Sequence, residues 1–251
     1  MKFRLGSHWQ DINVPDRATL VAAVSARLLT GQGFSLATLN LDHLVKLSHN
    51  PAFRLAYARA DMVVADGNPV VWLSRLARRP VELQPGSDLV LPLARIARDC
   101  GASVALVGST QGALEKAAAR LQREVPGLSV TACIAPTFGF DPEGAAADAV
   151  LNEVEWSGAR LCFLALGAPK QEVFAARARG VLPGVGFASV GAGLDFLAET
   201  QKRAPLWVRR LALEWAWRMA GNPRRLARRY LQCALILPGQ TLSALRLRVT
   251  A

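Results

Sequence analysis

The chain has few of the residues that hold metals or form disulfide bonds. Its 251 residues include four cysteines and three histidines. The cysteines lie apart in apolar stretches without paired spacing, which predicts buried, reduced thiols rather than disulfides or a zinc site. The histidines form no HxxxH or HExxH pattern, and no DxD motif occurs. The sequence thus shows no common metal-binding pattern, and no cofactor is expected.

Long hydrophobic runs are also missing. Although 51% of the residues are hydrophobic, no stretch approaches the roughly 18 uninterrupted apolar residues that a membrane-spanning helix needs. The first residues have no apolar core followed by a cleavage site, so no signal peptide is expected. The sequence thus predicts a cytoplasmic protein that is at most peripheral to a membrane.

Acidic residues are nearly absent from the last fifty positions. Residues 202–251 hold eleven of the thirty Lys and Arg residues and one acid, Glu214, and so carry +10 of the net charge of +11. Charge alone leaves nucleic acid, an anionic membrane and a lipid diphosphate open as partners. Aromatic residues among the arginines favour the membrane interface. These are Trp207, Trp215, Trp217 and Tyr230.

Apolar, β-rich segments alternate with helical patterns in the first part of the chain. The expected strands cover 34–39, 62–65, 103–107, 128–132, 160–166 and 186–190. Several are apolar throughout, which is typical of parallel strands covered on both faces. The alternation predicts an α/β fold with a doubly wound, mainly parallel, Rossmann-like sheet. In such sheets ligands bind beyond the carboxyl ends of the strands.

Capping residues mark the expected helix starts. Ser87 and Thr110 can each cap a helix, and Asp141–Pro142 combines a cap with a first-turn proline. The expected helices cover 87–98, 110–124 and 141–156.

The pattern changes near residue 200. We place an α/β domain at 1–198 and a basic, helical, membrane-associating appendage at 199–251. Within the appendage the expected helices cover 205–220 and 222–235. Pro238–Gly239 is expected to stop the second helix, which leaves a short amphipathic tail over 242–249.

Six segments match the pattern of one family, in the family's order. They are TLNLDHL (38–44), ADMVVADGNPVVW (60–72), PGSDLV (85–90), LGAPKQE (166–172), VGAGLDFLAETQKRAP (190–205) and LEWAWRMAGNPRRLARRY (213–230). On these segments the chain resembles the bacterial WecG/TagA/CpsF family, glycosyltransferase family 26. The resemblance spans most of the chain, and GAPKQE and the Glu-Trp…Arg-Arg-Tyr ending are its most specific parts.

The resemblance implies an inverting, metal-independent transferase in cell-surface polysaccharide synthesis, such as that of teichoic acid or exopolysaccharide. It would move a sugar from a UDP-sugar to a sugar on polyprenyl (undecaprenyl) diphosphate. The donor sugar stays open between N-acetylmannosamine, its uronic acid and glucose. The appendage would attach to the inner face of the cell membrane and complete the site. The acceptor sugar, the pathway and a homo-oligomeric state also stay open.

Inversion needs a base that takes the proton of the acceptor hydroxyl while UDP leaves from the opposite face. Asp66 is our candidate, because it ends an apolar strand, Gly67 allows close approach beside it, and the resemblance points to it. The alternative is that Asp66 caps the helix beginning near Asn68. Thr38 and Asn40 are candidates for orienting a sugar, unless they only begin the next helix.

Without a metal, backbone amides, helix N-termini and cationic side chains must stabilise the leaving diphosphate. The turns at 108–112 and 167–171 are of this kind. The candidate UDP-sugar ligands are Gly67, Gly108, Phe140, Gly167, Pro169, Lys170, Gln171, Gly191 and Asp195. The bland alternatives are a solvated charge for Lys170, core packing for Phe140 and a turn cap for Asp195. Glu172 is either a ligand group or a helix-dipole partner.

Guanidinium groups bind phosphate oxygens bidentately, which favours appendage arginines as ligands of the lipid diphosphate. The candidates are Arg203, Arg218, Arg224, Arg225 and Arg228. The alternative is a solvated basic face attracted to membrane lipids. The family pattern also has an arginine shortly before Gly86-Ser87-Asp88, whereas this chain reads Glu82-Leu83-Gln84-Pro85. Arg75, Arg78, Arg79 or an appendage arginine is expected to take its place.

Two other classes of function compete with a transferase. A nucleic-acid-binding or membrane-binding protein without transferase activity would use the basic tail. However, the chain has no recognised nucleic-acid motif, and the tail's tryptophans and leucines favour lipid. An oxidoreductase of similar fold would carry GxGxxG after its first strand, where this chain reads TLNLDH. The sequence therefore favours a glycosyltransferase that does not bind nucleic acid.

Overall fold

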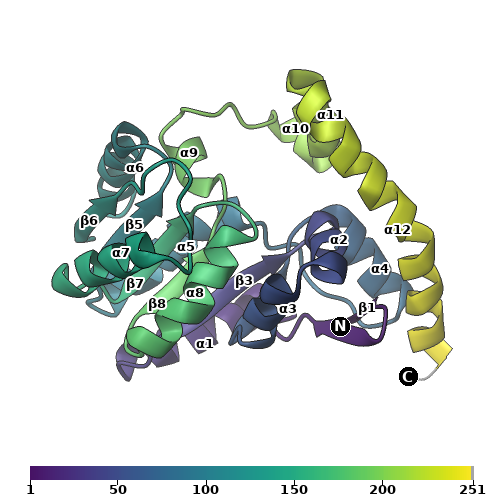
Figure 1. Cartoon of the computed structure of the whole chain (residues 1–251), viewed down its shortest axis with the longest axis horizontal. Coiled ribbons are helices and arrows are strands. Elements are labelled where there is room, and N and C mark those ends of the chain that lie inside the picture. Colours follow the sequence, from purple (N-terminus) through teal and green to yellow (C-terminus); the bar gives the residue numbers. More distant parts are fainter. Residues whose placement is uncertain (250–251) are drawn as a thin grey trace.

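The computed structural model describes residues 1–249, apart from the side chain of Arg225. Its centre is a six-stranded sheet in the order β4-β3-β8-β7-β5-β6 (Figure 1). Every neighbouring pair is parallel. The strands are β3 (Phe34–Leu39), β4 (Met62–Ala65), β5 (Val104–Gly108), β6 (Val130–Ile134), β7 (Leu161–Ala165) and β8 (Gly186–Ser189). The predicted doubly wound α/β fold is confirmed, and β3 and β4 have the predicted bounds.

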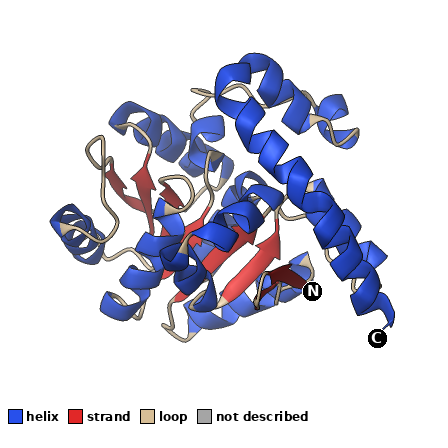
Figure 2. Ribbon diagram, turned by 45° about the vertical axis from the view of Figure 1, so that its right-hand side comes forward, coloured by secondary structure: helices blue, strands red, loops and turns tan. Residues whose placement is uncertain are grey.

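Successive side chains of each strand enter different hydrophobic cores, because they point to opposite faces of the sheet. In β3, Phe34 and Leu36 join the core of one face, and Ala37 and Leu39 join a core of the other. Helices cover both faces (Figure 2). One face carries α1 (Arg17–Leu29), α5 (Gly86–Asp99), α6 (Gln111–Glu124) and α9 (Gly193–Leu197). The other carries α2 (Leu41–His49), α3 (Pro51–Ala58), α4 (Asn68–Leu76), α7 (Ala145–Trp156) and α8 (Lys170–Val181).

Of the three predicted helix starts, the one at Ser87 is wrong, because Ser87 lies inside α5, whose N-cap residue is Pro85. Thr110 caps α6 as predicted, since its side chain accepts from the Ala113 amide. The predicted start at Asp141–Pro142 is wrong, because α7 begins at Ala145. The Asp141 carboxylate accepts instead from the Glu143 amide at 3.0 Å. This closes a local Asx turn, which places Pro142 before the helix.

The N-terminal hairpin was not expected from the sequence. Strands β1 (Lys2–Leu5) and β2 (His8–Asp11) form a separate antiparallel pair. Only the side chains of Phe3 and Leu5 reach the core from β1. Strands this short, with polar residues between the apolar ones, give a weak sequence signal.

The appendage consists of α10 (Leu206–Arg210), α11 (Glu214–Gly221) and α12 (Pro223–Val249). The single helix expected over 205–220 is therefore wrong: it breaks at Ala212, whose φ of 59° is left-handed. The expected stop at Pro238–Gly239 is also wrong, because α12 runs through it. In Figure 1 this helix runs down one side of the molecule toward the N-terminal hairpin.

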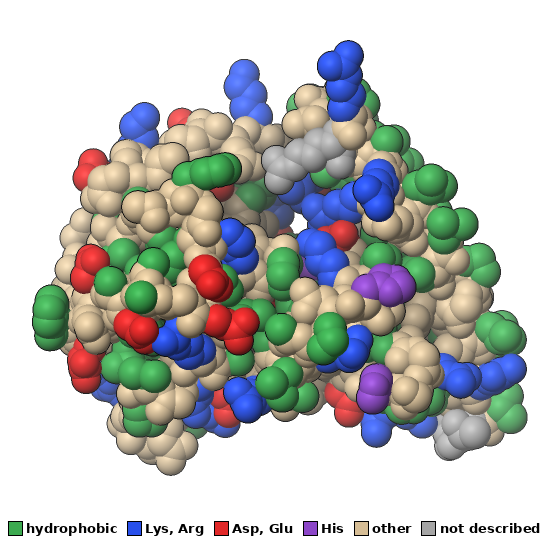
Figure 3. Space-filling view, viewed as in Figure 1, with side chains coloured by type: hydrophobic (Ala, Val, Ile, Leu, Met, Phe, Trp, Pro, Cys, Tyr) green, Lys and Arg blue, Asp and Glu red, His purple; other side chains and the backbone are tan. Residues whose placement is uncertain are grey.

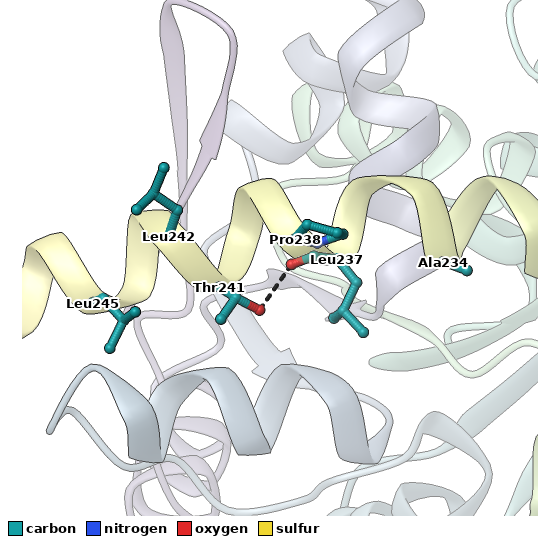
Figure 4. A pocket seen from close by; sticks show the side chains of 6 residues that line it. All are labelled: Ala234, Leu237, Pro238, Thr241, Leu242 and Leu245. Atoms are coloured by element: carbon teal, nitrogen blue, oxygen red, sulfur yellow. Dashed lines mark hydrogen bonds between the residues drawn. The ribbon is translucent and has the colours of Figure 1, made fainter.

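Tertiary packing explains why α12 continues through Pro238. A proline in a helix interior removes one backbone hydrogen bond. Ala244 is buried in the core that contains Phe3 and Leu5, and Ile236 and Leu237 pack against the same core. Packing on both sides of Pro238 therefore keeps the helix intact. Figure 4 shows the proline between Ala234 and Leu242, with the Thr241 hydroxyl donating to the Leu237 carbonyl at 2.9 Å. Within residues 1–249, no helix is long and apolar enough to cross a bilayer.

The Pro238→Ala substitution tests the continuity of α12. Restoring the missing amide donor at this exposed site is expected to raise the free energy of unfolding by about 1–3 kcal/mol. Urea denaturation measures the change. Pro223→Ala is the control, because a proline in the first turn of a helix breaks no backbone hydrogen bond and its replacement should change little. A destabilised Pro238→Ala protein would show that the proline marks a real helix end.

Candidate functional site

Asp66 and Asn40 meet at the carboxyl edge of the sheet. Leu39 and Ala65 are partners in the parallel pairing of β3 and β4, so the residues that follow them lie side by side. The Asn40 side-chain amide donates to Asp66 Oδ2 at 3.3 Å, while Asn40 Oδ1 accepts from the His43 amide and caps α2. Asn40 thus caps α2, the alternative that the sequence offered, and its amide also contacts Asp66.

Asp66 is not a helix cap. The residue at the start of α4 is Gly67, and no side chain caps that helix. Gly67 has a φ of 102°, a left-handed value that strains other residues. This turn leads the chain away from β4 and leaves the Asp66 side chain at the strand end. The capping alternative is therefore wrong, and Asp66 remains available for chemistry.

The electrostatic surroundings of Asp66 include the appendage. Burial raises the pKa of Asp66, and the hydrogen bond from Asn40 opposes that shift. Glu214 of α11 raises the pKa further, while Arg218 and Arg229 lower it. Asp66 as a whole residue is only partly exposed to solvent. Figure 3 shows the molecular surface hollowed between the α/β body and the appendage, with Lys and Arg side chains gathered around the hollow.

Thr38 lies deeper than Asp66. It is buried, and its carbonyl accepts from the Tyr57 hydroxyl at 2.8 Å. The Tyr57 hydroxyl has one proton and donates it to the Thr38 carbonyl. It therefore accepts a hydrogen bond from His43 Nδ1, which lies 2.7 Å away. Burial lowers the pKa of His43 to about 3, so the imidazole is neutral. His43 is therefore a buried packing residue, and the Thr38 backbone is held beneath the site.

The turns that follow β5 and β7 lie side by side. The Ser109 amide donates to the Ala165 carbonyl at 3.3 Å. A Cβ on Gly108 would come within 2.5 Å of the Ala165 carbonyl group, so only glycine permits this approach. Pro169 precedes α8 as its N-cap residue, after a cis peptide bond.

The first turn of α8 is tied to its neighbours. Lys170 Nζ donates to the Phe140 carbonyl at 2.7 Å and is therefore not a free surface charge. Gln171 Oε1 accepts from the Gly191 amide at 3.3 Å, which links this turn to the one after β8. Gln171 Nε2 donates to Glu172 Oε1 at 2.8 Å. Glu172 is 3% exposed, and among the described residues its Oε2 has no hydrogen-bond partner.

Two predicted ligands are engaged within the protein. The Asp195 carboxylate accepts from the Ser109 hydroxyl and, at 3.0 Å, from the Gln201 side chain, so it links the turn after β5 to the segment after α9. Phe140 is 6% exposed and packs against Phe174 with ring centroids 5.9 Å apart, as in the core alternative. The neighbouring Phe138 is fully exposed. In the described part, no three His, Cys, Asp or Glu side chains are grouped to hold a metal ion.

The candidate arginines divide into two groups. Arg203 pairs with Asp88 of the Gly86-Ser87-Asp88 segment and lies over the Phe196 ring. It thus reaches, from the appendage, the segment that lacks its expected arginine. The exposed group consists of Arg218, Arg224 and Arg228. The side chain of Arg225 lies outside the described part.

Sequence reasoning missed one arginine contact. Arg229 Nε lies 3.0 Å from Asp42 Oδ1, and Asp42 pairs with Lys46 at 2.8 Å. The spacing of Asp42 and Lys46, i and i+4 on one helix, is the signal that indicates this pair from sequence. Nothing in the sequence indicates that Arg229 joins it, because α12 reaches α2 only in the tertiary structure.

Substituting Glu172→Gln is expected to change how stability depends on pH. Burial raises the pKa of Glu172 from 4.5 to about 7. In that pH range the folded protein holds a proton that the unfolded chain releases, so stability falls as the pH rises. The Glu172→Gln variant has no titrating group at this position, so its stability does not fall with rising pH in this way. Its free energy of unfolding should therefore rise, relative to the natural protein, by on the order of 2–3 kcal/mol between pH 5 and pH 8. Urea denaturation at both pH values measures this, and a constant difference would contradict the assignment.

Comparisons with known proteins bear on the whole chain. Residues 8–249 match the family described as "Glycosyl transferase WecG/TagA/CpsF family". The chain is also 28% identical, over 200 residues, to an N-acetylglucosaminyldiphosphoundecaprenol N-acetyl-beta-D-mannosaminyltransferase of Bacillus spizizenii. That match covers 78% of this chain and 75% of the relative. The match confirms the predicted resemblance: the chain belongs to the WecG/TagA/CpsF family and is a glycosyltransferase.

Proposed function

We propose that the protein transfers N-acetylmannosamine, with inversion and without a metal, from its UDP derivative to N-acetylglucosamine on polyprenyl diphosphate. The name of the Bacillus spizizenii relative supports this acceptor and this sugar. The observation that carries the proposal is Asp66. It lies at the carboxyl edge of the sheet, has a raised pKa, and faces the basic appendage.

Asp66 acts as the general base. Asn40 donates to Oδ2, and among the described residues Oδ1 accepts no hydrogen bond, which leaves it for the acceptor hydroxyl. The hydroxyl oxygen forms a bond to C1 of the donor sugar while the bond from C1 to the diphosphate oxygen breaks on the opposite face. The hydroxyl proton passes to Asp66, and UDP leaves with the electron pair. A raised pKa makes the carboxylate a stronger base for this step.

The turns after β5 and β7 bind the diphosphate of the donor. Each leads into the N-terminus of a helix of at least twelve residues, α6 or α8. Such termini present backbone amides and a partial positive charge to an anion. Gly167 and Gly191 let the backbone approach the ligand, and the fixed ammonium group of Lys170 adds a positive charge beside the turn.

The appendage presents the lipid substrate. Arg218 lies close enough to Asp66 to lower its pKa, which supports assigning this guanidinium and the exposed arginines of α12 to the acceptor diphosphate. Arg203 adds a further positive charge beside Asp88. We place the boundary of the catalytic domain at 198 and assign 199–251 to the appendage. We infer from this arrangement that the protein acts on the cytoplasmic face of an anionic membrane.

An apolar row on α12 supports membrane contact. Its members lie three, four or seven residues apart, so they share one face of the helix, and they are 41–86% exposed. They are Leu231, Leu235, Leu242, Leu245 and Val249. Trp207 of α10 is 63% exposed. An apolar row beside arginines suits the boundary between head groups and acyl chains. Because α12 also packs on the core, point variants test this role better than removal of the appendage.

The Asp66→Asn substitution tests the base. Turnover is expected to fall by about 100-fold or more, because general-base catalysis contributes roughly 10²–10⁴-fold. UDP affinity should be retained. The assay combines a polyprenyl-diphosphate N-acetylglucosamine acceptor with a panel of UDP-sugars, without metal, and identifies products by mass. Asp99→Asn, an exposed carboxylate at the end of α5, is the control. Unchanged turnover in Asp66→Asn would exclude this residue, and a different preferred donor would correct the sugar.

The apolar row predicts the response of membrane binding to substitution. The double variant Leu235→Gln and Leu242→Gln should bind phosphatidylglycerol vesicles on the order of 100-fold more weakly, since burial of each leucine contributes about 1.5–3 kcal/mol. Vesicle sedimentation measures the partition. Leu29→Gln on α1 is the matched control, because Leu29 is equally apolar and 70% exposed. Equal binding by the double variant and the natural protein would remove α12 from the membrane contact.

A further inference from the structure

A chain of charged contacts runs from the appendage to the turn that opens α8. Arg229 of α12 lies 3.0 Å from Asp42 in the first turn of α2. Asp42 lies 2.8 Å from Lys46, one helical turn further along α2. Lys46 Nζ also donates to the Ala168 carbonyl at 3.2 Å. Three elements that are distant in sequence are thus joined through two side chains of α2.

Asp42 is the centre of this chain. It is 8% exposed, and a buried carboxylate is costly unless charged partners compensate it. Its partners come from two elements, Arg229 from α12 and Lys46 from α2 itself. Neither Arg229 Nε nor Asp42 Oδ2 is aligned for a hydrogen bond with any described residue, so these contacts act through charge. Loss of Arg229 would leave Asp42 to Lys46 alone and change how Lys46 is held.

The far end of the chain lies at the proposed diphosphate turn. Ala168 precedes Pro169, the residue that caps α8. The next turn carries Gln171, which is bound to the Gly191 amide. Lys46 also lowers the pKa of Glu172 in this turn, against the larger effect of burial. The Lys46 ammonium group therefore faces the turn both through a hydrogen bond and through its charge.

The same helix touches the proposed base. Asn40, the cap of α2, donates to Asp66. If the appendage displaced α2, both the contact between Asn40 and Asp66 and the contact between Lys46 and Ala168 would therefore change. This makes α2 the physical link between the two halves of the site.

We propose that Asp42 and Lys46 are positioning residues that couple the appendage to the 167–171 turn. When α12 is packed against α2, the Arg229–Asp42 ion pair keeps the Lys46 ammonium group hydrogen-bonded to the Ala168 carbonyl. The 167–171 turn then keeps the conformation that binds the donor diphosphate. The inference rests on the proposed use of UDP-sugar at this turn. Since coupling between sites is reciprocal, bound donor also favours the seated appendage. Arg229 thereby affects a substrate that it does not touch.

The test is a double-mutant cycle on the full-length protein. Calorimetry gives the affinity for UDP of Arg229→Met, Lys46→Met and the double variant. Each single substitution is expected to weaken UDP binding roughly fivefold or more, a typical size for coupling between sites. The double variant should be no weaker than the poorer single variant, because both substitutions break one chain of contacts. Lys46→Arg, which keeps the charge, should restore most of the affinity.

A matched control separates positioning from stability. Arg179, in the last turn of α8, pairs with Asp61 at 3.2 Å. Asp61 lies just before β4, at the opposite edge of the sheet. Arg179→Met removes an ion pair from α8, the helix that the 167–171 turn opens, but at the other end of it. The substitution should therefore lower stability but leave UDP affinity unchanged. In turnover assays Arg229→Met should raise the donor KM, which an arginine that only bound the acceptor would not do.

The outcomes are distinct. If the natural protein binds UDP and both single variants bind it equally well, the coupling is wrong. Fully additive effects would show two independent contacts and would overturn the chain as well. If the natural protein itself does not bind UDP, the proposed donor fails, and the coupling fails with it.

Discussion

The register between β3 and β4 is the constraint on which the site depends. Because Leu39 and Ala65 are paired, Asn40 and Asp66 leave the sheet together, and the Asn40 amide can reach the Asp66 carboxylate. A slip of one residue would turn Asp66 toward the other face. The apolar side chains of these fully buried strands enforce the register, since a slip would exchange the members of two cores. The packing of the cores and the geometry of the site therefore depend on the same strand register.

The appendage is part of the fold as well as a carrier of charge. Its last helix supplies Ala244 to the core beside the N-terminal hairpin, and its arginines act on Asp66 and Asp42. Membrane contact, acceptor binding and alignment of the base are therefore mechanically connected in the function proposed above. In that proposed function the site would be complete only when α12 is packed against α2. A protein that acts on a lipid-linked substrate would then be active mainly where its appendage meets that substrate.

The positions of several candidate site residues at the carboxyl ends of strands could be predicted because residue type and strand position agreed. Asn40 and Asp66 follow apolar strands, and the glycine-rich turns after β5 and β7 follow two others. The roles of Phe140 and Asp195 could not be chosen from sequence, because a buried ring and an exposed one, or a turn cap and a ligand, have the same local pattern. The Glu172 carboxylate shows the same limit. Only burial beside Gln171 makes its pKa unusual.

Local sequence determined the six strands of the central sheet, the alternation that makes it parallel, the Thr110 cap and the basic character of the last fifty residues. These features depend on short-range periodicity and composition. The tertiary structure decided that α12 continues through Pro238, that Arg203 reaches Asp88, and that Arg229 reaches Asp42. Each of these depends on contacts between segments more than one hundred residues apart, or on a core that such segments share, and no local pattern contains that information.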